Sequence, residues 1–499
     1  MDDVTVLQLG YEDWSTKYSL PPEAKWTYAD HLDDCPKKPY CLVFLDRVPE
    51  ADELDVLMKC TKAYCLYVTE DVKISGRFLN FCISKICKRI RRKDIQTFLD
   101  NELRFYFARS YGEKFRNTNV DIAHGFKGDV KWLGNCGIKL SGDFGEEYGQ
   151  LMYWRNNIPI AQGQMIEFWM EYEKDEQVDI KLVVTQYKSG SLSEVTKKWE
   201  FTEDKFKHVV SVVNDEAAGP VSVSVHAKGS GTFKIIALHD RFARKGHGHF
   251  IPGGVRKVST KREEVFFYFD PGDMKPPLNV YFSGYKTKEG FEGYFLMRNM
   301  GAPFLLISES RLEGGGFYMG SKEYEALITD AIREYIDDLD FKPSDVIMSG
   351  LSMGTYGALY YGCDIAPHAL ILGKPLANIG DVALNEKLKR PGGFPTSLDV
   401  VMNIYGDANR DNALRVNDKL WSKFEATEWD NTKFIMSYMI EDDYDGTAYE
   451  SIISHLNSEG VKVYGKGVHG RHNDNTGAIV GWFSSQFTKT LREDFGRDI

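Results

Sequence analysis

Short hydrophobic runs alternate with more polar, helix-like stretches over the first part of the chain. Three runs rich in Val, Leu and Tyr occupy residues 4–10, 41–47 and 64–70. Such runs are typical of strands buried in a parallel sheet. The pattern therefore predicts a small Rossmann-like α/β unit over residues 1–118. No G-x-G-x-x-G loop follows the first run, so dinucleotide binding is not indicated.

The pattern changes between residues 119 and 250, where apolar and polar residues alternate in several segments, for example 166–174 and 178–188. Repeated short strands separated by turn residues predict an antiparallel β-sandwich. Its aromatic side chains could form a carbohydrate-binding platform, but core packing is the favoured interpretation for most of them. The tryptophans of this region are Trp132, Trp154, Trp169 and Trp199.

A glycine-rich stretch, residues 241–255, follows and is expected to be a linker. It contains His247 and His249, but the sequence offers them no neighbouring Cys or carboxylate. We therefore interpret them as loop histidines and not as metal ligands.

Strand and helix patterns alternate again over residues 260–499, which predicts a doubly wound, mainly parallel sheet of the α/β-hydrolase type. Within it, an apolar strand runs into Gly350-Leu351-Ser352-Met353-Gly354, and a helix-like stretch follows. This is the strand–turn–helix context of a nucleophile elbow, in which the turn projects the serine hydroxyl above the sheet. Ser352 is therefore the candidate nucleophile.

A serine hydroxyl needs a base, and in this fold the acid and then the histidine follow the serine along the chain. The predicted strand at 432–440 ends in an acidic cluster, where Asp442 is the candidate acid and Glu441 and Asp443 are alternatives. The loop after the next strand contains His469 and His472. We favour His472 as the base, because Gly470-Arg471-His472 resembles the Gly-x-His loop of many esterases.

An oxyanion hole would combine the backbone N–H of Met353 with one from a loop after an earlier strand. Ser283-Gly284-Tyr285 occupies such a position, and Gly284 would allow close approach of an acyl group. Gly284 and Met353 are therefore the candidate donors.

Composition narrows the function classes. The 499 residues include 62 Lys and Arg against 73 Asp and Glu, a net charge of −11, which argues against a general nucleic-acid binder. The sequence shows no signal-peptide pattern and no apolar stretch long enough to span a membrane, so we expect a cytoplasmic location. A peripheral association with the inner face of the membrane is left open.

The eight cysteines lie mostly in apolar segments without zinc-ligand spacing, so we expect free thiols, no metal and no tightly bound cofactor. One further feature is a basic run at residues 85–93. It suits either a solvated helix face or a docking patch for an acidic partner.

Taken together, the opening at residues 4–28, the three-part layout, SGLSMGTYGALYYG, YMIEDDYDGTAYE and HGRHNDNT resemble the second accessory secretory protein family of the Gram-positive accessory Sec systems. The resemblance spans nearly the whole chain. It implies an O-acetyltransferase that modifies N-acetylglucosamine on serine-rich-repeat adhesins before export, with an acetyl donor that stays unknown. Implied partners are the other accessory Sec proteins, the SecA-type motor and the adhesin. Carried over by motif, Ser352 is the nucleophile, His472 the base and Asp442 the acid.

Two alternatives stay open at this point. One is a non-catalytic export chaperone or adaptor, which would use the basic run and the aromatic sandwich. The other is a carbohydrate esterase, in which water replaces the sugar hydroxyl.

Overall fold

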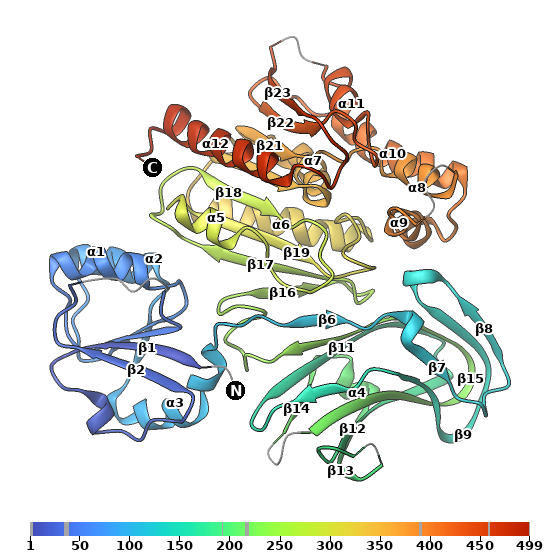
Figure 1. Ribbon diagram of the computed structural model, residues 1–499, viewed down its shortest axis with the longest axis horizontal. Helices are drawn as coiled ribbons and strands as arrows, with labels where there is room; N and C mark the ends of the chain where they lie inside the picture. Colours follow the sequence, from blue (N-terminus) through green and yellow to red (C-terminus); the bar gives the residue numbers. More distant parts are fainter. Residues whose placement is uncertain are drawn as a thin grey trace.

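The computed structural model describes residues 3–33, 39–191, 193–214, 219–388, 392–457 and 460–498. It is a mixed α/β structure with three sheets, which follow one another along the chain (Figure 1). In Figure 1 the first sheet lies beside the second, and the third sits above them. The domain limits 1–118, 119–250 and 260–499 are predictions from the sequence.

The first sheet has five parallel strands in the order β2-β1-β3-β4-β5. One face packs on α3 through residues such as Phe98, and the other packs on α1 and α2 through Leu57 and Phe81. Burial on both faces explains the apolar runs in the sequence. The elements are β1 (Val4–Leu9), β2 (Ala24–Ala29), β3 (Leu42–Leu45), α1 (Ala51–Cys60), β4 (Leu66–Thr69), α2 (Gly76–Ser84), β5 (Lys88–Ile90) and α3 (Ile95–Asn101).

The expectation that the basic run is a helix face is wrong. Its residues form the edge strand β5 and a 3-10 turn, Arg92–Asp94. The run is short and follows the C-terminal end of α2, so it adds a strand to the sheet instead of extending a helix.

The second sheet is antiparallel and contains ten strands. They are β6 (Gly112–Lys114), β7 (Val120–Ile122), β8 (Asp129–Trp132), β9 (Ile138–Trp154), β10 (Ile158–Ile160), β11 (Met165–Lys174), β12 (Val178–Tyr187), β13 (Val195–Thr202), β14 (Val210–Val213) and β15 (Gly219–Phe242), with the short helix α4 (Glu203–Phe206). The antiparallel strands predicted from alternation are present. They form one hydrogen-bonded sheet and not the two separate sheets of a sandwich.

The long strand β15 explains this single sheet. Its first half pairs with β12 and its second half with β11, while β9 pairs with its middle part, from Ser224 to Ile235. The register shifts near Gly229, and Gly229 and Gly231 both adopt positive φ angles. Such irregularities bend a strand, and one hydrophobic cluster draws on both halves of β15.

The tryptophans of this sheet do not share one surface. Trp154 and Trp169 are buried, and only Trp132 is largely exposed, at 50%. Arg256 and Arg262 approach the Trp169 ring at 3.8 and 3.9 Å. Trp169 therefore helps to join the second sheet to the third, as core packing would predict.

The third sheet has eight strands in the order β16-β17-β19-β18-β20-β21-β22-β23, with β16 and β17 antiparallel to their neighbours and the others parallel. The strands are β16 (Val255–Val258), β17 (Glu264–Asp270), β18 (Leu278–Phe282), β19 (Phe304–Glu309), β20 (Val346–Leu351), β21 (Ala369–Gly373), β22 (Lys433–Met439) and β23 (Lys462–Val468). The mainly parallel sheet expected from residue 260 onward is thus present.

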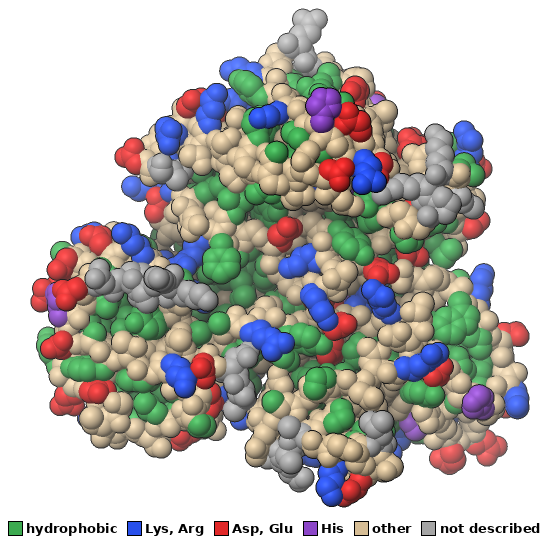
Figure 2. All heavy atoms as spheres, in the orientation of Figure 1, with side chains coloured by type: hydrophobic (Ala, Val, Ile, Leu, Met, Phe, Trp, Pro, Cys, Tyr) green, Lys and Arg blue, Asp and Glu red, His purple; other side chains and the backbone are tan. Residues whose placement is uncertain are grey.

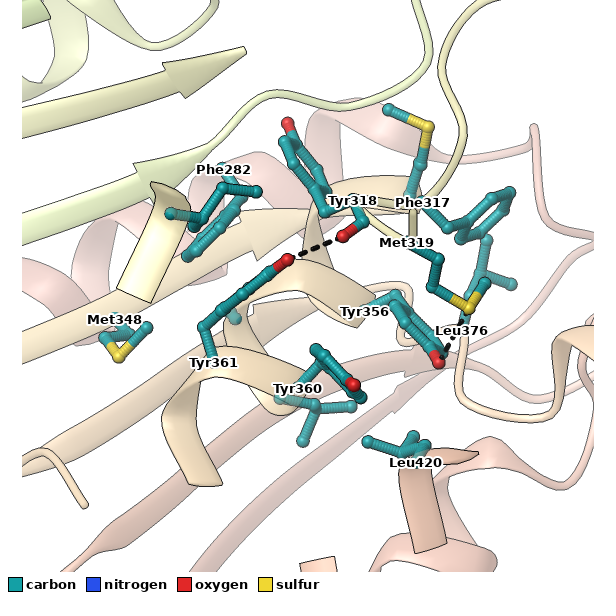
Figure 3. Packing of buried hydrophobic residues seen from close by; sticks show 14 of the residues in the cluster. Phe282, Phe317, Tyr318, Met319, Met348, Tyr356, Tyr360, Tyr361, Leu376 and Leu420 are labelled. Carbon is teal, nitrogen blue, oxygen red and sulfur yellow. Dashed lines mark hydrogen bonds between the residues drawn. The ribbon is translucent and has the colours of Figure 1, made fainter. Parts of the chain in front are cut away.

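Helices cover both faces of this sheet. On one face, α6, α7, α8 and α10 pack in a large core that includes Phe282, Tyr318 and Tyr361 (Figure 3). On the other, α5 and α12 pack through Met297 and Phe483. The helices are α5 (Tyr294–Asn299), α6 (Lys322–Asp338), α7 (Met353–Ile365), α8 (Ile379–Leu388), α9 (Thr396–Tyr405), α10 (Arg410–Glu425), α11 (Ala448–Ser454) and α12 (Thr476–Phe495). None of the helices in the described ranges is long and apolar enough to cross a membrane.

Candidate active site

The turn between β20 and α7 places Ser352 at the carboxyl end of the sheet. Ser352 has φ 52° and ψ −120°, a backbone conformation that side-chain-bearing residues rarely adopt. Its N–H donates to the carbonyl of Gly373 at 2.8 Å, and its own carbonyl accepts from the Thr355 N–H at 2.9 Å. The neighbouring chain therefore holds the strained turn in place.

Two glycines make this turn sterically feasible. A Cβ on Gly350 would lie 2.4 Å from the Gly354 carbonyl, and one on Gly354 would lie 2.1 Å from the Phe282 carbonyl oxygen. Both distances are far below van der Waals contact. The Gly-x-Ser-x-Gly spacing is thus required by the close approach of β18, β20 and α7.

His472 brings the base to this serine from the loop after β23. Its Nε2 lies 2.8 Å from Ser352 Oγ, and its Nδ1 lies 2.8 Å from Asp442 Oδ2. The imidazole is only 2% exposed, whereas Ser352 is half-buried and reachable from solvent. The three side chains predicted from separate motifs are therefore brought together in one hydrogen-bonded relay.

Asp442 is fixed in its orientation by its own loop. Its second carboxylate oxygen accepts the N–H groups of Tyr444 and Asp445 at 2.8 and 3.2 Å. Burial opposes ionisation, but the hydrogen bond and charge interaction with His472, together with these N–H groups, lower the pKa of Asp442 below its usual value. Asp442 therefore stays a carboxylate and holds the Nδ1 proton of His472.

The alternative residues of the acidic cluster have other partners. Glu441 accepts from His469 Nδ1 at 2.9 Å and from the Gly470 N–H at 2.6 Å, at an exposed site. Asp443 accepts the backbone N–H of His472 at 3.0 Å. These acids support the histidine loop, and only Asp442 faces the His472 ring.

Lys374 is a residue of this site that the sequence analysis missed. It follows β21 directly with φ 55°, and its Nζ donates to the carbonyls of His472 and Asp474 and to Thr476 Oγ1 at 2.5, 2.9 and 3.0 Å. Burial lowers the pKa of its ammonium group. Lys374 therefore connects the histidine loop to the end of the neighbouring strand. In the sequence, a lysine directly after a buried apolar strand is the pattern that could have identified it.

The two candidate oxyanion donors differ in this structure. Met353 is the first residue of α7, so its N–H belongs to the helix N-terminus, where N–H groups lack partners within the helix. The N–H of Gly284, in contrast, donates to Glu292 Oε2 at 2.6 Å. The Gly284 N–H can therefore donate to an oxyanion only after its hydrogen bond to Glu292 has broken.

An aromatic row extends from the relay and was not predicted. The His472 ring stacks on Tyr444 with ring centres 4.5 Å apart, Tyr444 stacks on Phe394 at 5.1 Å, and Phe394 contacts Tyr285 edge-on at 5.8 Å. These three aromatic residues lie in loops that are far apart in the sequence. No local sequence pattern therefore predicts that their rings come together.

The basic run and the linker histidines have structural partners. Arg92 bonds to Asp71 and Asp46, and Arg91 bonds to Asp94. His247 bonds to Glu102 and to the Tyr106 hydroxyl at 2.8 and 3.0 Å, which ties the linker to the first unit. These ion pairs account for two of the six cationic side chains in the run.

A second buried histidine lies where the second and third sheets meet. His239 Nδ1 lies 2.5 Å from Glu289, and its Nε2 lies 3.6 and 3.9 Å from Glu171 and Glu264. Arg241 bonds to both Glu264 and Glu289, and Arg256 bonds to Glu264. The ligand atoms of Glu171, His239 and Glu264 lie within 4.8 Å of one another, a cluster that sequence spacing did not reveal.

The molecule is a mixed α/β protein with a serine–histidine–carboxylate arrangement at the carboxyl end of the parallel strands in its third sheet. Comparison with known proteins identifies the family. A family model described as "Accessory Sec system GspB-transporter" matches residues 4–497, and the chain belongs to this family.

Two relatives, each described as an accessory Sec system protein Asp2, support this assignment. The protein from Streptococcus gordonii is 34% identical over 99% of this chain and 98% of its own length. The protein from Staphylococcus aureus (strain NCTC 8325 / PS 47) is 40% identical over 78% of this chain and 75% of its own length. A solved structure of the glycosylation-associated Gap123 complex from Streptococcus agalactiae contains a chain that is 36% identical, with a TM-score of 0.88 and 99% of both chains covered. The accessory Sec resemblance is thus confirmed.

Proposed function

We propose that this protein is an O-acetyltransferase on an α/β-hydrolase-type sheet, which uses Ser352, His472 and Asp442 to move an acetyl group onto a sugar hydroxyl. The observation that carries the proposal is the continuous relay of two 2.8 Å contacts from Ser352 Oγ to Asp442 Oδ2. Nucleophile and base lie within hydrogen-bonding reach, and the acid orients the base.

The first half-reaction forms an acetyl-serine. His472 Nε2 takes the proton of Ser352 Oγ as the oxygen attacks the acetyl carbonyl of a donor, and the N–H of Met353 stabilises the oxyanion. When the tetrahedral intermediate collapses, the donor's leaving group departs with the proton from His472. Asp442 stabilises the imidazolium meanwhile.

The second half-reaction regenerates the serine. A sugar hydroxyl loses its proton to His472 and attacks the acetyl-serine, and the same histidine then returns the proton to Ser352 Oγ. The family resemblance supports N-acetylglucosamine on a serine-rich-repeat adhesin as the acceptor. Because the S. agalactiae relative belongs to a Gap123 complex, we extend the proposal to assembly with other accessory Sec proteins and a SecA-type motor during export.

The test is substitution of the nucleophile in the host cell. With Ser352→Ala, the exported adhesin should lose its O-acetyl groups while its other sugars stay, as measured by mass spectrometry of the glycopeptides. Unchanged acetylation would refute the proposal.

A second function, that of an export adaptor, is favoured by the solved complex that contains a close relative. It is compatible with the first. If Ser352→Ala abolishes acetylation but the adhesin is still secreted at the parental level, the assembly role is independent of the chemistry. A carbohydrate esterase would instead release acetate from acetylated sugars without any acceptor.

A further inference from the structure

A polar cavity of about 420 Å³ lies between the second and third sheets. In Figure 2, basic and acidic side chains face one another along the boundary between these two parts. The second sheet and its loops contribute Glu113, Lys114, Arg116, Asn119, Asn135 and Asn156, and the third contributes residues of the loops 286–290 and 308–314. Amides, hydroxyls, ammonium groups and carboxylates thus converge on one space.

Lys114, at the end of β6, is the most informative of these residues. Its Nζ is buried, and within the described parts of the chain it has no hydrogen-bond partner. Burial lowers the pKa of this ammonium group to about 8, although Glu171, Glu289, Glu313 and Asp399 face it from the surrounding elements. A buried ammonium group without a partner is costly, so a hydrogen-bonding ligand at this position would be stabilised.

The charges around the cavity are largely balanced. Glu113 bonds to Lys288, and Glu313 lies 3.2 Å from Arg116. Glu289 is bound by Arg241 and by His239 outside the cavity. A highly charged ligand would upset this balance, whereas hydroxyl groups can accept from an ammonium group and donate to a carboxylate. The lining therefore suits a neutral, polyhydroxylated molecule.

Two loops connect the lining of the cavity to the surroundings of the relay. The Lys286 N–H donates to the Gly314 carbonyl at 3.2 Å, which joins the loop after β18 to the loop after β19. A Cβ on Gly314 would meet the Tyr285 ring, and one on Gly315 would meet the Met353 side chain. Tyr285, which ends the aromatic row from His472, thus stands between the relay and the cavity, where a sugar ring could stack on it.

We infer that this cavity is a subsite for the sugar units next to the one that is acetylated, with Lys114 and the side-chain amides of Asn119 and Asn156 as its polar contacts. The inference rests on the proposed function. In this arrangement the second sheet binds the acceptor directly. It does so through polar residues at its boundary with the third sheet, and not through its exposed aromatic side chains.

The experiment uses the full-length protein, p-nitrophenyl acetate as acetyl donor and chitotriose as acceptor. Lys114→Met should raise the KM for chitotriose about tenfold, the usual effect of losing a hydrogen bond to a charged group. Thr287→Trp, a substitution at an exposed position of the lining, should have a similar effect by narrowing the cavity. Lys127→Met and Thr97→Trp, both at exposed positions elsewhere, are the matched controls.

The ratio of acetyl transfer to hydrolysis, measured on the same sample, separates the two proposals. If the parent protein shows no acetyl transfer that depends on Ser352, the proposed function fails. If the parent transfers acetyl but both cavity variants keep the parental KM and ratio, the cavity holds only solvent and the subsite is refuted. Binding of chitotriose to Ser352→Ala protein by calorimetry, weakened by Thr287→Trp, would support the subsite independently of catalysis.

Discussion

Two buried histidines with carboxylate partners, His472 and His239, have different surroundings in this protein. Both imidazoles are almost fully buried, at 2% and 0% exposed, and each has a carboxylate at Nδ1. At Nε2 they differ. His472 faces the hydroxyl of Ser352, whereas His239 faces Glu171 and Glu264.

The comparison indicates that the group facing Nε2, and not burial alone, determines whether a histidine holds a proton or can accept one. Burial disfavours the imidazolium of His239, but the charge of Glu289 and the contact with Glu171 outweigh it and raise its pKa to about 9. His239 therefore keeps its proton near neutral pH and serves as a structural cation. His472 has a neutral hydroxyl at Nε2, which leaves the lone pair available to accept a proton.

The largest expected effect is at the nucleophile. Ser352→Ala should lower kcat for p-nitrophenyl acetate hydrolysis by roughly 10⁴-fold or more, as in other serine triads. Thermal unfolding should be unchanged, because the side chain is half-buried and packs little. Retention of more than a tenth of the activity would show that the relay is not the reacting centre.

Asp442→Asn tests the acid of the relay. The amide should favour the wrong tautomer of His472 and lower kcat by about 10⁴-fold. Glu441→Gln is the matched control and should change kcat less than threefold, since Glu441 contacts His469 and not His472. If both variants lost kcat to the same extent, Asp442 would not be the acid of the relay.

His239→Gln tests the structural histidine and should act on stability. Loss of one charge from a buried network should lower the free energy of unfolding by about 3 kcal/mol, measured with denaturant at neutral pH. Because the folded pKa of His239 is raised, its contribution is complete below about pH 6.5 and is lost as pH rises through about 9. The gap between parent and variant should therefore close above that pH.

His226→Gln, on the same strand and half-buried, is the control and should cost under about 1 kcal/mol. If the deficit of His239→Gln were independent of pH, the proton on His239 would not be what stabilises the interface.

The smallest effect is expected at Glu292. Glu292→Ala removes the carboxylate that accepts the Gly284 N–H and should raise kcat for p-nitrophenyl acetate about fivefold, because the donor becomes available and a like charge is removed. Glu428→Ala, at an exposed position, should leave kcat unaltered. A decrease in the Glu292 variant would mean that Gly284 is not an oxyanion donor.

Local patterns predicted much of the fold. The apolar runs at 4–10, 41–47 and 64–70 contain β1, β3 and β4, and the runs after residue 260 contain β17 to β23, whereas β16 begins at the end of the predicted linker. Strand β2 was missed because its residues are only partly buried and do not form a continuous apolar run like those of the other strands. The bend in β15 was missed because it depends on which strands pair with each half, and that pairing is not local.

The relay was predictable because each member carries its own signal: glycines around Ser352, an acidic strand end at Asp442 and a Gly-x-His loop at His472. Lys374, Glu292 and the aromatic row were not predicted. Their roles come from contacts between loops that the sheet brings together. Among the described residues, Cys41, Cys65, Cys82, Cys87, Cys136 and Cys363 carry free thiols, and Cys35 lies outside the described residues.

The backbone of Ser352 has an evolutionary consequence. At φ 52°, the position suits glycine better than any residue with a side chain. A single change of Ser352 to glycine would remove the nucleophile and relieve the turn without disturbing its neighbours. A descendant of this protein could therefore lose the proposed acetyl transfer in one step and keep its fold.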